Sequence, residues 1–166
     1  MPGPDGRPVD PVRPETTWTV IYCFPGAFAP SDSGNPAGWD AIPGTRGCTL
    51  ESETYRDHHR SFAGHNATIH GVSAQRPDQL AAFTAHADLP FPLLSDIALE
   101  LAAALRLPTF YVAGVERLKR LTLLVDRDRV IRELIYPIQD PAESVRGALN
   151  ALVRLGAPGL TPSRQV

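Results

Sequence analysis

The chain is poor in cysteine, in methionine and in long apolar segments. It has two cysteines, Cys23 and Cys48, and one methionine among 166 residues. Two cysteines cannot form the disulfide framework of a small secreted domain. No segment approaches the roughly 18 consecutive apolar residues of a membrane-spanning helix. The formal net charge of −2 gives no general attraction to nucleic acid or to an anionic membrane, so neither partner is expected.

The motifs of several common cofactor sites are also missing. There is no Cys-x-x-Cys pair, which argues against an ordinary dithiol oxidoreductase, and there is no Gly-rich phosphate loop or paired-cysteine zinc pattern. We therefore expect no metal and no cofactor. Residues 1–15 lack the apolar core of a secretory signal peptide, which favours a cytoplasmic protein with access to reducing thiols.

The composition that is present indicates one globular domain. With 43% hydrophobic residues, the chain can bury a sizeable core. The proline-rich residues 1–15 predict a flexible N-terminal arm, and residues 157–166 predict a flexible tail. Residues 16–156 are then the single folded domain.

Hydrophobic periodicity predicts alternating strands and helices. Extended segments are expected at 19–24, 67–73, 108–112, 121–125 and 130–136. Helices are expected at 49–62, at 77–87, after Ser95-Asp96 and from Asp140 onward. The helix after Ser95-Asp96 is expected to place Ile97, Leu101 and Leu105 in the core. This order predicts an α/β fold in which helices cover both faces of a central sheet.

Cys48 is the residue with the clearest chemical potential. It follows a Gly-Thr-Arg-Gly segment, residues 44–47, and precedes a predicted helix. Unpaired backbone N–H groups at a helix N-terminus favour a thiolate. A free cysteine is more often an inert buried side chain, but flanking glycines and the charge of Arg46 are poor core material. We therefore expect a reactive thiol at Cys48.

Three segments resemble peroxiredoxins, in the order in which that family has them. Thr45-Arg46-Gly47-Cys48-Thr49 resembles the family's Thr-x-x-Cys-Thr motif, the segment 91–96 reads Phe-Pro-Leu-Leu-Ser-Asp, and the segment 120–126 reads Arg-Leu-Thr-Leu-Leu-Val-Asp. The similarity runs from about Trp18 to Leu155 and is greatest to peroxiredoxin Q (bacterioferritin comigratory protein) and to alkyl hydroperoxide reductases. It implies a thioredoxin-like fold with a central mixed sheet.

The resemblance also implies roles for individual residues. Cys48 corresponds to the peroxidatic nucleophile, which attacks a peroxide oxygen and becomes a sulfenic acid. Thr45 would hydrogen-bond the peroxide, and Arg120 would stabilise the thiolate and the charge that develops on the leaving oxygen. Glu51 would orient the arginine.

The loop before Cys48 departs from the family pattern. The position seven residues before the cysteine, where the family has proline, is Ala41, whereas Pro43 stands nearer and Pro25 is the apparent counterpart. Residues 26–42 are therefore interpreted as an insertion. Because it carries Phe28, Trp39 and Ile42, the insertion is expected to form a lid over the thiol or an interface.

The means of recycling also differs. Peroxiredoxin Q relatives often place a resolving cysteine five residues after the nucleophile, where this chain has Glu53. Cys23 lies in an apolar strand and is interpreted as a buried structural thiol, with a resolving role as the minor alternative. An external thiol is expected to reduce the sulfenic acid: thioredoxin, glutaredoxin or a low-molecular-weight thiol.

Histidines are concentrated between residues 58 and 70. His58 and His59 are adjacent and point to different faces of a helix, so they make a poor metal pair. A Cys-His hydrolase pair is also conceivable, but His59 lies about three turns, or ~16 Å, from Cys48 along one helix. Such a pair would need a histidine from elsewhere.

The leading hypothesis is a thiol-dependent peroxidase that reduces hydrogen peroxide or organic hydroperoxides, and the resemblance suggests a homodimer. The first alternative keeps the fold but uses Cys48 in another, for example biosynthetic, pathway or as a redox sensor. The second alternative is a non-catalytic thioredoxin-fold binding module, whose thiol would react slowly.

Overall fold

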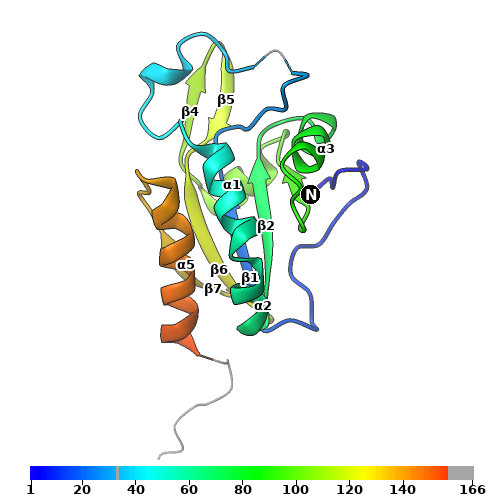
Figure 1. Cartoon of the computed structure of the whole chain (residues 1–166), viewed down its shortest axis with the longest axis vertical. Helices are drawn as coiled ribbons and strands as arrows, with labels where there is room; N and C mark the ends of the chain where they lie inside the picture. Colours follow the sequence, from blue (N-terminus) through cyan, green and yellow to red (C-terminus); the bar gives the residue numbers. More distant parts are fainter. Residues whose placement is uncertain (33, 157–166) are drawn as a thin grey trace, which may run out of the picture.

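The computed structural model describes residues 1–32 and 34–156, built around a mixed five-stranded sheet (Figure 1). Its strands are β1 (Trp18–Cys23), β2 (Ala67–Ser73), β3 (Leu93–Ser95), β6 (Leu121–Asp126) and β7 (Ile131–Ile135). In space they follow the order β3-β2-β1-β6-β7. The first three are parallel, whereas β6 runs antiparallel to β1 and β7 antiparallel to β6. The predicted central mixed sheet is confirmed.

Within the described residues, five α-helices surround this sheet, and a separate hairpin extends from one end. The helices are α1 (Cys48–Asp57), α2 (His59–Gly64), α3 (Pro77–His86), α4 (Glu100–Leu105) and α5 (Pro141–Leu155). The hairpin consists of β4 (Thr109–Val112) and β5 (Val115–Leu118), and a short 3-10 helix, η1, spans Trp39–Ala41. Figure 1 shows α1 and α5 side by side in front of the sheet, and the hairpin at the end where α1 begins.

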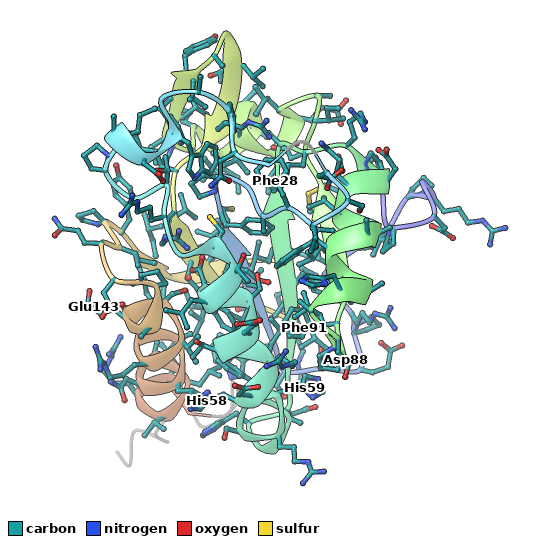
Figure 2. All side chains as sticks on the ribbon, turned by 45° about the horizontal axis from the view of Figure 1, so that its top comes forward. Phe28, His58, His59, Asp88, Phe91 and Glu143 are labelled. Atoms are coloured by element: carbon teal, nitrogen blue, oxygen red, sulfur yellow. The ribbon has the colours of Figure 1, made fainter. Side chains whose placement is uncertain are left out.

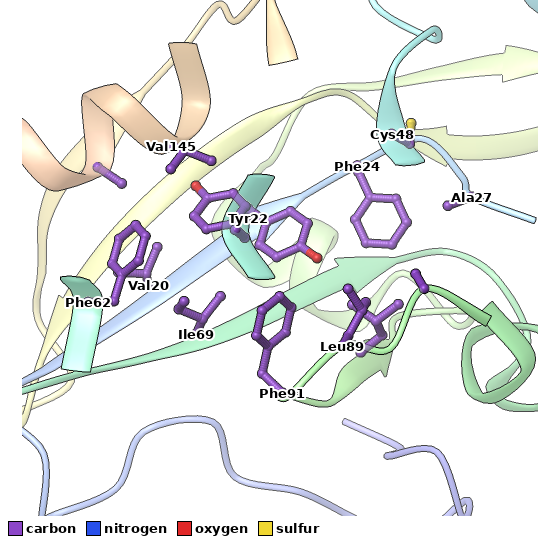
Figure 3. Packing of buried hydrophobic residues seen from close by; sticks show 14 of the residues in the cluster. Val20, Tyr22, Phe24, Ala27, Cys48, Phe62, Ile69, Leu89, Phe91 and Val145 are labelled. Carbon is purple, nitrogen blue, oxygen red and sulfur yellow. The ribbon is translucent and has the colours of Figure 1, made fainter. Parts of the chain in front are cut away.

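The larger core cluster packs α1, α2, α3 and α5 against one face of the sheet. Alternate residues of β1 point to opposite faces, so Val20 and Tyr22 belong to this cluster while Ile21 and Cys23 belong to the other. The ring of Tyr22 stacks on Tyr55 of α1 with centroids 4.3 Å apart. Figure 3 shows Tyr22 in the middle of this cluster and Cys48 at its end, beyond Phe24. The core thus reaches directly to the start of α1.

The second face of the sheet is covered by α4 and by the N-terminal segment. Met1, Val9 and Val12 pack against the cluster that contains Ile21 and Cys23. The backbone N–H of Ser95 also donates to the carbonyl of Pro2, at 2.9 Å. The expectation of a flexible arm at residues 1–15 is therefore wrong for this segment. The physical reason is that α4 has only two turns and leaves apolar sheet surface that the segment covers.

Several element boundaries differ from those expected. The predicted helix at 49–62 is divided at His58 into α1 and α2. Helix α4 starts at Glu100, and the carboxylate of Asp96 accepts hydrogen bonds from the backbone N–H groups of Leu101 and Ala102, both at 3.0 Å. Ile97, which was expected in the core, is 50% exposed. Strands β3 and β5 were not predicted, and the expected tail at 157–166 lies outside the described residues.

Within residues 1–32 and 34–156, no helix is both long enough and apolar enough to cross a bilayer. The same residues contain no group of three or more His, Cys, Asp or Glu side chains arranged to hold a metal ion.

His70 on β2 provides a test of the packing on the second face. Its side chain is 2% exposed, and neither ring nitrogen has a hydrogen-bond partner among the described residues. Burial, aided by the nearby charge of Arg13, lowers the pKa of His70 from 6.5 to about 4. The folded protein therefore holds His70 neutral at pH values at which the unfolded chain protonates it.

We predict that this histidine makes the protein less stable in mild acid. Between pH 6.5 and pH 4 the unfolded chain binds a proton at His70 that the folded protein does not bind. The stability that depends on a neutral His70 is therefore complete above pH 6.5, the ordinary pKa, and is lost as the pH falls toward 4. We compare how far the free energy of unfolding falls between pH 7 and pH 5. This fall should be larger in the wild type than in His70→Gln, by roughly 2 kcal/mol. Urea denaturation at both pH values measures this difference. The exposed His65→Gln should keep the wild-type difference, and equal differences in all three proteins would contradict the prediction.

Candidate active site

Cys48 is the first residue of α1, and the preceding Gly47 fixes how the chain enters that helix. Gly47 has a φ of 87°, a left-handed conformation that side chains disfavour. A Cβ at this position would also lie 2.4 Å from Cγ of Pro141. Both constraints require glycine, and the close approach places the first turn of α5 against the loop before the thiol.

The thiol is almost completely buried. Cys48 is 3% exposed, and its Sγ lies 3.3 Å from Nη2 of Arg120 and 3.3 Å from the carbonyl oxygen of Thr45. A neutral thiol donates to that carbonyl, whereas a thiolate accepts from the guanidinium. The structure thus places a cationic hydrogen-bond donor in contact with the sulfur at the start of a helix.

Arg120 contacts α1 and the loop before it, both of which are far from Arg120 in sequence. It precedes β6, its Nη1 forms an ion pair with Oε2 of Glu51 on α1, and its Nη2 also donates to the carbonyl of Arg46 at 2.9 Å. The side chains of the pair are 1% and 0% exposed, respectively. Because an unpaired charge is very costly at such a site, Glu51 compensates the arginine and fixes its direction.

Thr45 is brought beside Cys48, but its hydroxyl is already engaged. Oγ1 lies 2.6 Å from the carbonyl oxygen of Trp39 and 2.8 Å from that of Ile42. A hydroxyl has one hydrogen to donate and two lone pairs with which to accept. Thr45 therefore donates to the insertion and is left to accept a hydrogen bond from a bound molecule.

A cavity of about 480 Å³ opens above the sulfur. On one side it is lined by residues of the 26–42 insertion, among them Phe28, Asp32 and Trp39, and on the other by the loop that carries Thr45 and Cys48. His86, at the end of α3, completes the wall. Figure 2 shows Phe28 near the start of α1. This volume is typical of a small-molecule site.

Asp32 and His86 were not predicted as part of the site. Neither lies in a recognisable motif, and His86 is brought to the cavity only by the packing of α3. No hydrogen bond joins His86 to Cys48 among the described residues. His59 instead stacks near Phe91, with ring centroids 6.3 Å apart, and Figure 2 shows His58, His59 and Phe91 well away from Phe28.

Two other candidate residues lie apart from the cavity. Pro43 lines a separate hollow of about 350 Å³ with Gly44 and Arg120. Cys23 is fully buried in the core cluster on the opposite face of the sheet from Cys48. Burial raises the pKa of the Cys23 thiol to about 12. In this fold Cys23 is neither adjacent to Cys48 nor ionised at neutral pH.

Fold and site together define a thioredoxin-like domain in which Cys48, at the start of a helix, contacts the guanidinium of Arg120. The AhpC/TSA family model matches residues 40–134, more than half of the chain. This protein belongs to the AhpC/TSA family.

Individual relatives agree with this assignment. The chain is 37% identical to peroxiredoxin Bcp of Bacillus subtilis over 93 residues. These residues make up 54% of this chain and 59% of the Bacillus protein, so the match spans less than two thirds of that relative. A relative from Mycobacterium tuberculosis is 28% identical over 142 residues, covering 84% of this chain and 80% of its own.

A solved structure supports the fold. The crystal structure of the peroxidoxin BcpB from Mycobacterium tuberculosis superimposes with a TM-score of 0.75 at 24% identity, covering 93% of this chain and 91% of the other. The predicted thioredoxin-like fold and the predicted kinship with the peroxiredoxin Q group are both confirmed.

We predict that the stability of the site depends on the buried ion pair. Glu51→Gln leaves the charge of Arg120 buried without a counter-ion, so the free energy of unfolding should fall by about 3 kcal/mol. Chemical denaturation measures this loss. The matched control is Glu143→Gln on α5, because Glu143 is 55% exposed and lies 3.9 Å from Arg146. This control should change stability by less than about 0.5 kcal/mol, and a similar loss in both variants would contradict the prediction.

Proposed function

We propose that this protein is a thiol-dependent peroxidase, with Cys48 as the nucleophile. The observation that carries the proposal is the contact of 3.3 Å between Nη2 of Arg120 and Sγ of Cys48, a residue that lines the cavity. Membership of the AhpC/TSA family and the peroxiredoxin relatives support the same reaction. They do not favour a repurposed enzyme, a redox sensor or a non-catalytic binding module.

In the proposed first step, the thiolate of Cys48 attacks one oxygen of the peroxide. An S–O bond forms, the O–O bond breaks, and the second oxygen leaves with a proton as water or alcohol, which converts Cys48 to a sulfenic acid. Arg120 stabilises the charge that develops on the leaving oxygen. Thr45, whose hydrogen is held by the carbonyls of Trp39 and Ile42, accepts a hydrogen bond from the hydroperoxide O–H.

The supporting residues act through Arg120 and through the loop. Glu51 is proposed as a positioning residue, because its ion pair directs the guanidinium toward the sulfur. Pro43 contributes to the turn that carries Gly44, whose carbonyl accepts from Arg120 Nη2 at 3.3 Å.

The second half of the cycle is proposed to use an external thiol. Position 53 is a glutamate, and Cys23 is buried on the other face of the sheet. A cytoplasmic location, which supplies such thiols, accords with this chemistry. A homodimer is also proposed, because Leu134 on the edge strand β7 and Tyr136 just after that strand are 56% and 44% exposed and offer apolar surface for pairing. Nucleic acid and membrane are not proposed as partners.

We predict that Cys48→Ser abolishes peroxide consumption, because a serine hydroxyl is not ionised at neutral pH. Arg120→Lys keeps a positive charge for Glu51 but loses the planar guanidinium that reaches Cys48 and the loop carbonyls together. It should slow formation of the sulfenic acid by at least about tenfold, or about 1.4 kcal/mol of barrier. Stopped-flow oxidation by hydrogen peroxide, with dimedone trapping and mass spectrometry, measures both effects. Circular dichroism verifies that each variant is folded, and wild-type oxidation in either folded variant would refute the mechanism.

We also predict that Cys23→Ser retains the complete cycle when an external thiol is supplied. The thiol of Cys23 is not exposed to the cavity and is not needed for resolution. Steady-state turnover with dithiothreitol should stay within about twofold of wild type. Loss of turnover with normal sulfenic acid formation would instead identify Cys23 as the resolving cysteine.

A further inference from the structure

Arg120 contacts the sulfur of Cys48 and also lines the separate hollow of about 350 Å³ beside Pro43 and Gly44. This hollow shares no lining residue with the cavity that Cys48 lines. Arg120 is the link between them, because its Nη2 lies 3.3 Å from Sγ of Cys48. A molecule bound in the hollow would therefore lie against the arginine that acts on the thiol, without entering the cavity.

The hollow has an excess of positive charge. Lys119 and Arg120 line it, and among the described residues no Asp or Glu does. Nη1 of Arg120 is paired with Glu51, but its Nε is shielded from solvent and has no acceptor. Lys119 is exposed and takes part in none of the ion pairs formed by the described residues. A shielded donor without an acceptor costs free energy, so this wall favours an anion.

A third cation lies on the neighbouring hairpin. Arg117 on β5 pairs with Phe110 on β4, and directly opposite residues of an antiparallel pair share one face. Arg117 therefore lies on the same face of the hairpin as Phe110, which lines the hollow. Arg117 is 8% exposed, and its Nε is shielded without an acceptor. Glu116 on the opposite face accepts instead from the hydroxyls of Thr109 and Tyr111, so it does not offset this charge.

The remaining wall of the hollow is mostly apolar. Three prolines, Phe110 and Ile138 contribute to it, together with the neutral side chains of Tyr136 and Gln139. Small-molecule sites commonly combine apolar walls with a few polar groups that fix the orientation of the ligand. A carboxylate forms charge-assisted hydrogen bonds with lysine and arginine, while an apolar body packs against proline and phenylalanine. The two kinds of wall together suit a small organic carboxylate.

We propose that this hollow binds a small organic carboxylate, which places its charge against Lys119 and Arg120 and thereby slows the oxidation of Cys48. The effect on oxidation rests on the proposed peroxidase function, whereas the binding does not. A negative charge beside the guanidinium offsets part of the positive charge with which Arg120 stabilises the leaving oxygen. Because carboxylate and peroxide occupy different places, excess peroxide does not relieve the inhibition.

Calorimetric titration of the reduced full chain tests the binding. The probes are cyclohexanecarboxylate, its neutral counterpart cyclohexanecarboxamide, and acetate, which has the charge without the ring. Cyclohexanecarboxylate should bind at least about tenfold more tightly than either of the others, because it alone uses both the cations and the apolar wall. Equal affinity for cyclohexanecarboxylate and either other probe would overturn the inference.

Lys119 is the only lysine of the chain, so acetylation of its amine reports directly on the hollow. Saturating cyclohexanecarboxylate should slow acetylation of Lys119 at least about threefold, as measured by mass spectrometry, with the N-terminal amine as internal reference. Lys119→Gln should weaken binding at least about tenfold. The matched control Arg60→Gln, which removes one charge from an exposed position on α2, should keep the wild-type affinity. An unprotected Lys119, or unchanged affinity in Lys119→Gln, would exclude this site.

Stopped-flow oxidation by hydrogen peroxide tests the effect on Cys48. Saturating cyclohexanecarboxylate should slow formation of the sulfenic acid at least about threefold in the wild type, at every peroxide concentration. Lys119→Gln should need about tenfold more carboxylate for the same inhibition. Equal inhibition of both proteins at equal carboxylate concentration would overturn the proposed site, and binding without slower oxidation would overturn its effect on the thiol.

The two levels of the proposal can fail separately. If peroxide does not oxidise Cys48 in the absence of carboxylate, the peroxidase function is wrong, and titration and acetylation still test the hollow. If peroxide oxidises Cys48 and the carboxylate does not bind, only the inference about the hollow is wrong.

Discussion

The buried ion pair between Arg120 and Glu51 is the interaction on which the rest of the site depends. It joins the loop before β6, the first turn of α1 and the carbonyl groups of the loop at 44–46 around one guanidinium. The pair alone does not account for overall stability, because the cost of desolvating two charges offsets much of their attraction. The ion pair instead fixes the position of the guanidinium. Glu51 binds one side of it and the loop carbonyls bind another, so that Nη2 of Arg120 also donates to the sulfur of Cys48.

The insertion at 26–42 takes part in the same arrangement. Thr45 was expected to contact the peroxide, and it also fastens the insertion, since its hydroxyl donates to Trp39 and Ile42. The two tasks are compatible because one uses the hydrogen and the other a lone pair. Residues of the insertion line the cavity, and Trp39 is at the same time buried in the main core cluster. The shape of the cavity and the geometry of the loop are thereby coupled.

Sequence reasoning identified the parts of the molecule that depend on local patterns. The buried strand at 19–24, the capped helix from Asp140 and the motif around Cys48 have local signatures, and β1, α5 and the start of α1 lie where these were expected. The N-terminal segment was misjudged because a proline-rich composition indicates only how a segment behaves by itself. In the folded protein the segment packs against apolar sheet surface that the short helix α4 does not cover. Asp32 and His86 carry no local signature, because they meet only through the packing of α3 and the insertion.

The contact between Gly47 and Pro141 has a consequence for how the protein matures. The loop that presents Cys48 is braced by the first turn of α5, and the guanidinium beside the sulfur comes from the residue before β6. Both supports lie far downstream of the cysteine along the chain. During synthesis on the ribosome, Cys48 emerges long before either of them. Until β6 and α5 have docked, an incomplete chain therefore lacks both the guanidinium beside the sulfur and the contact that braces the loop.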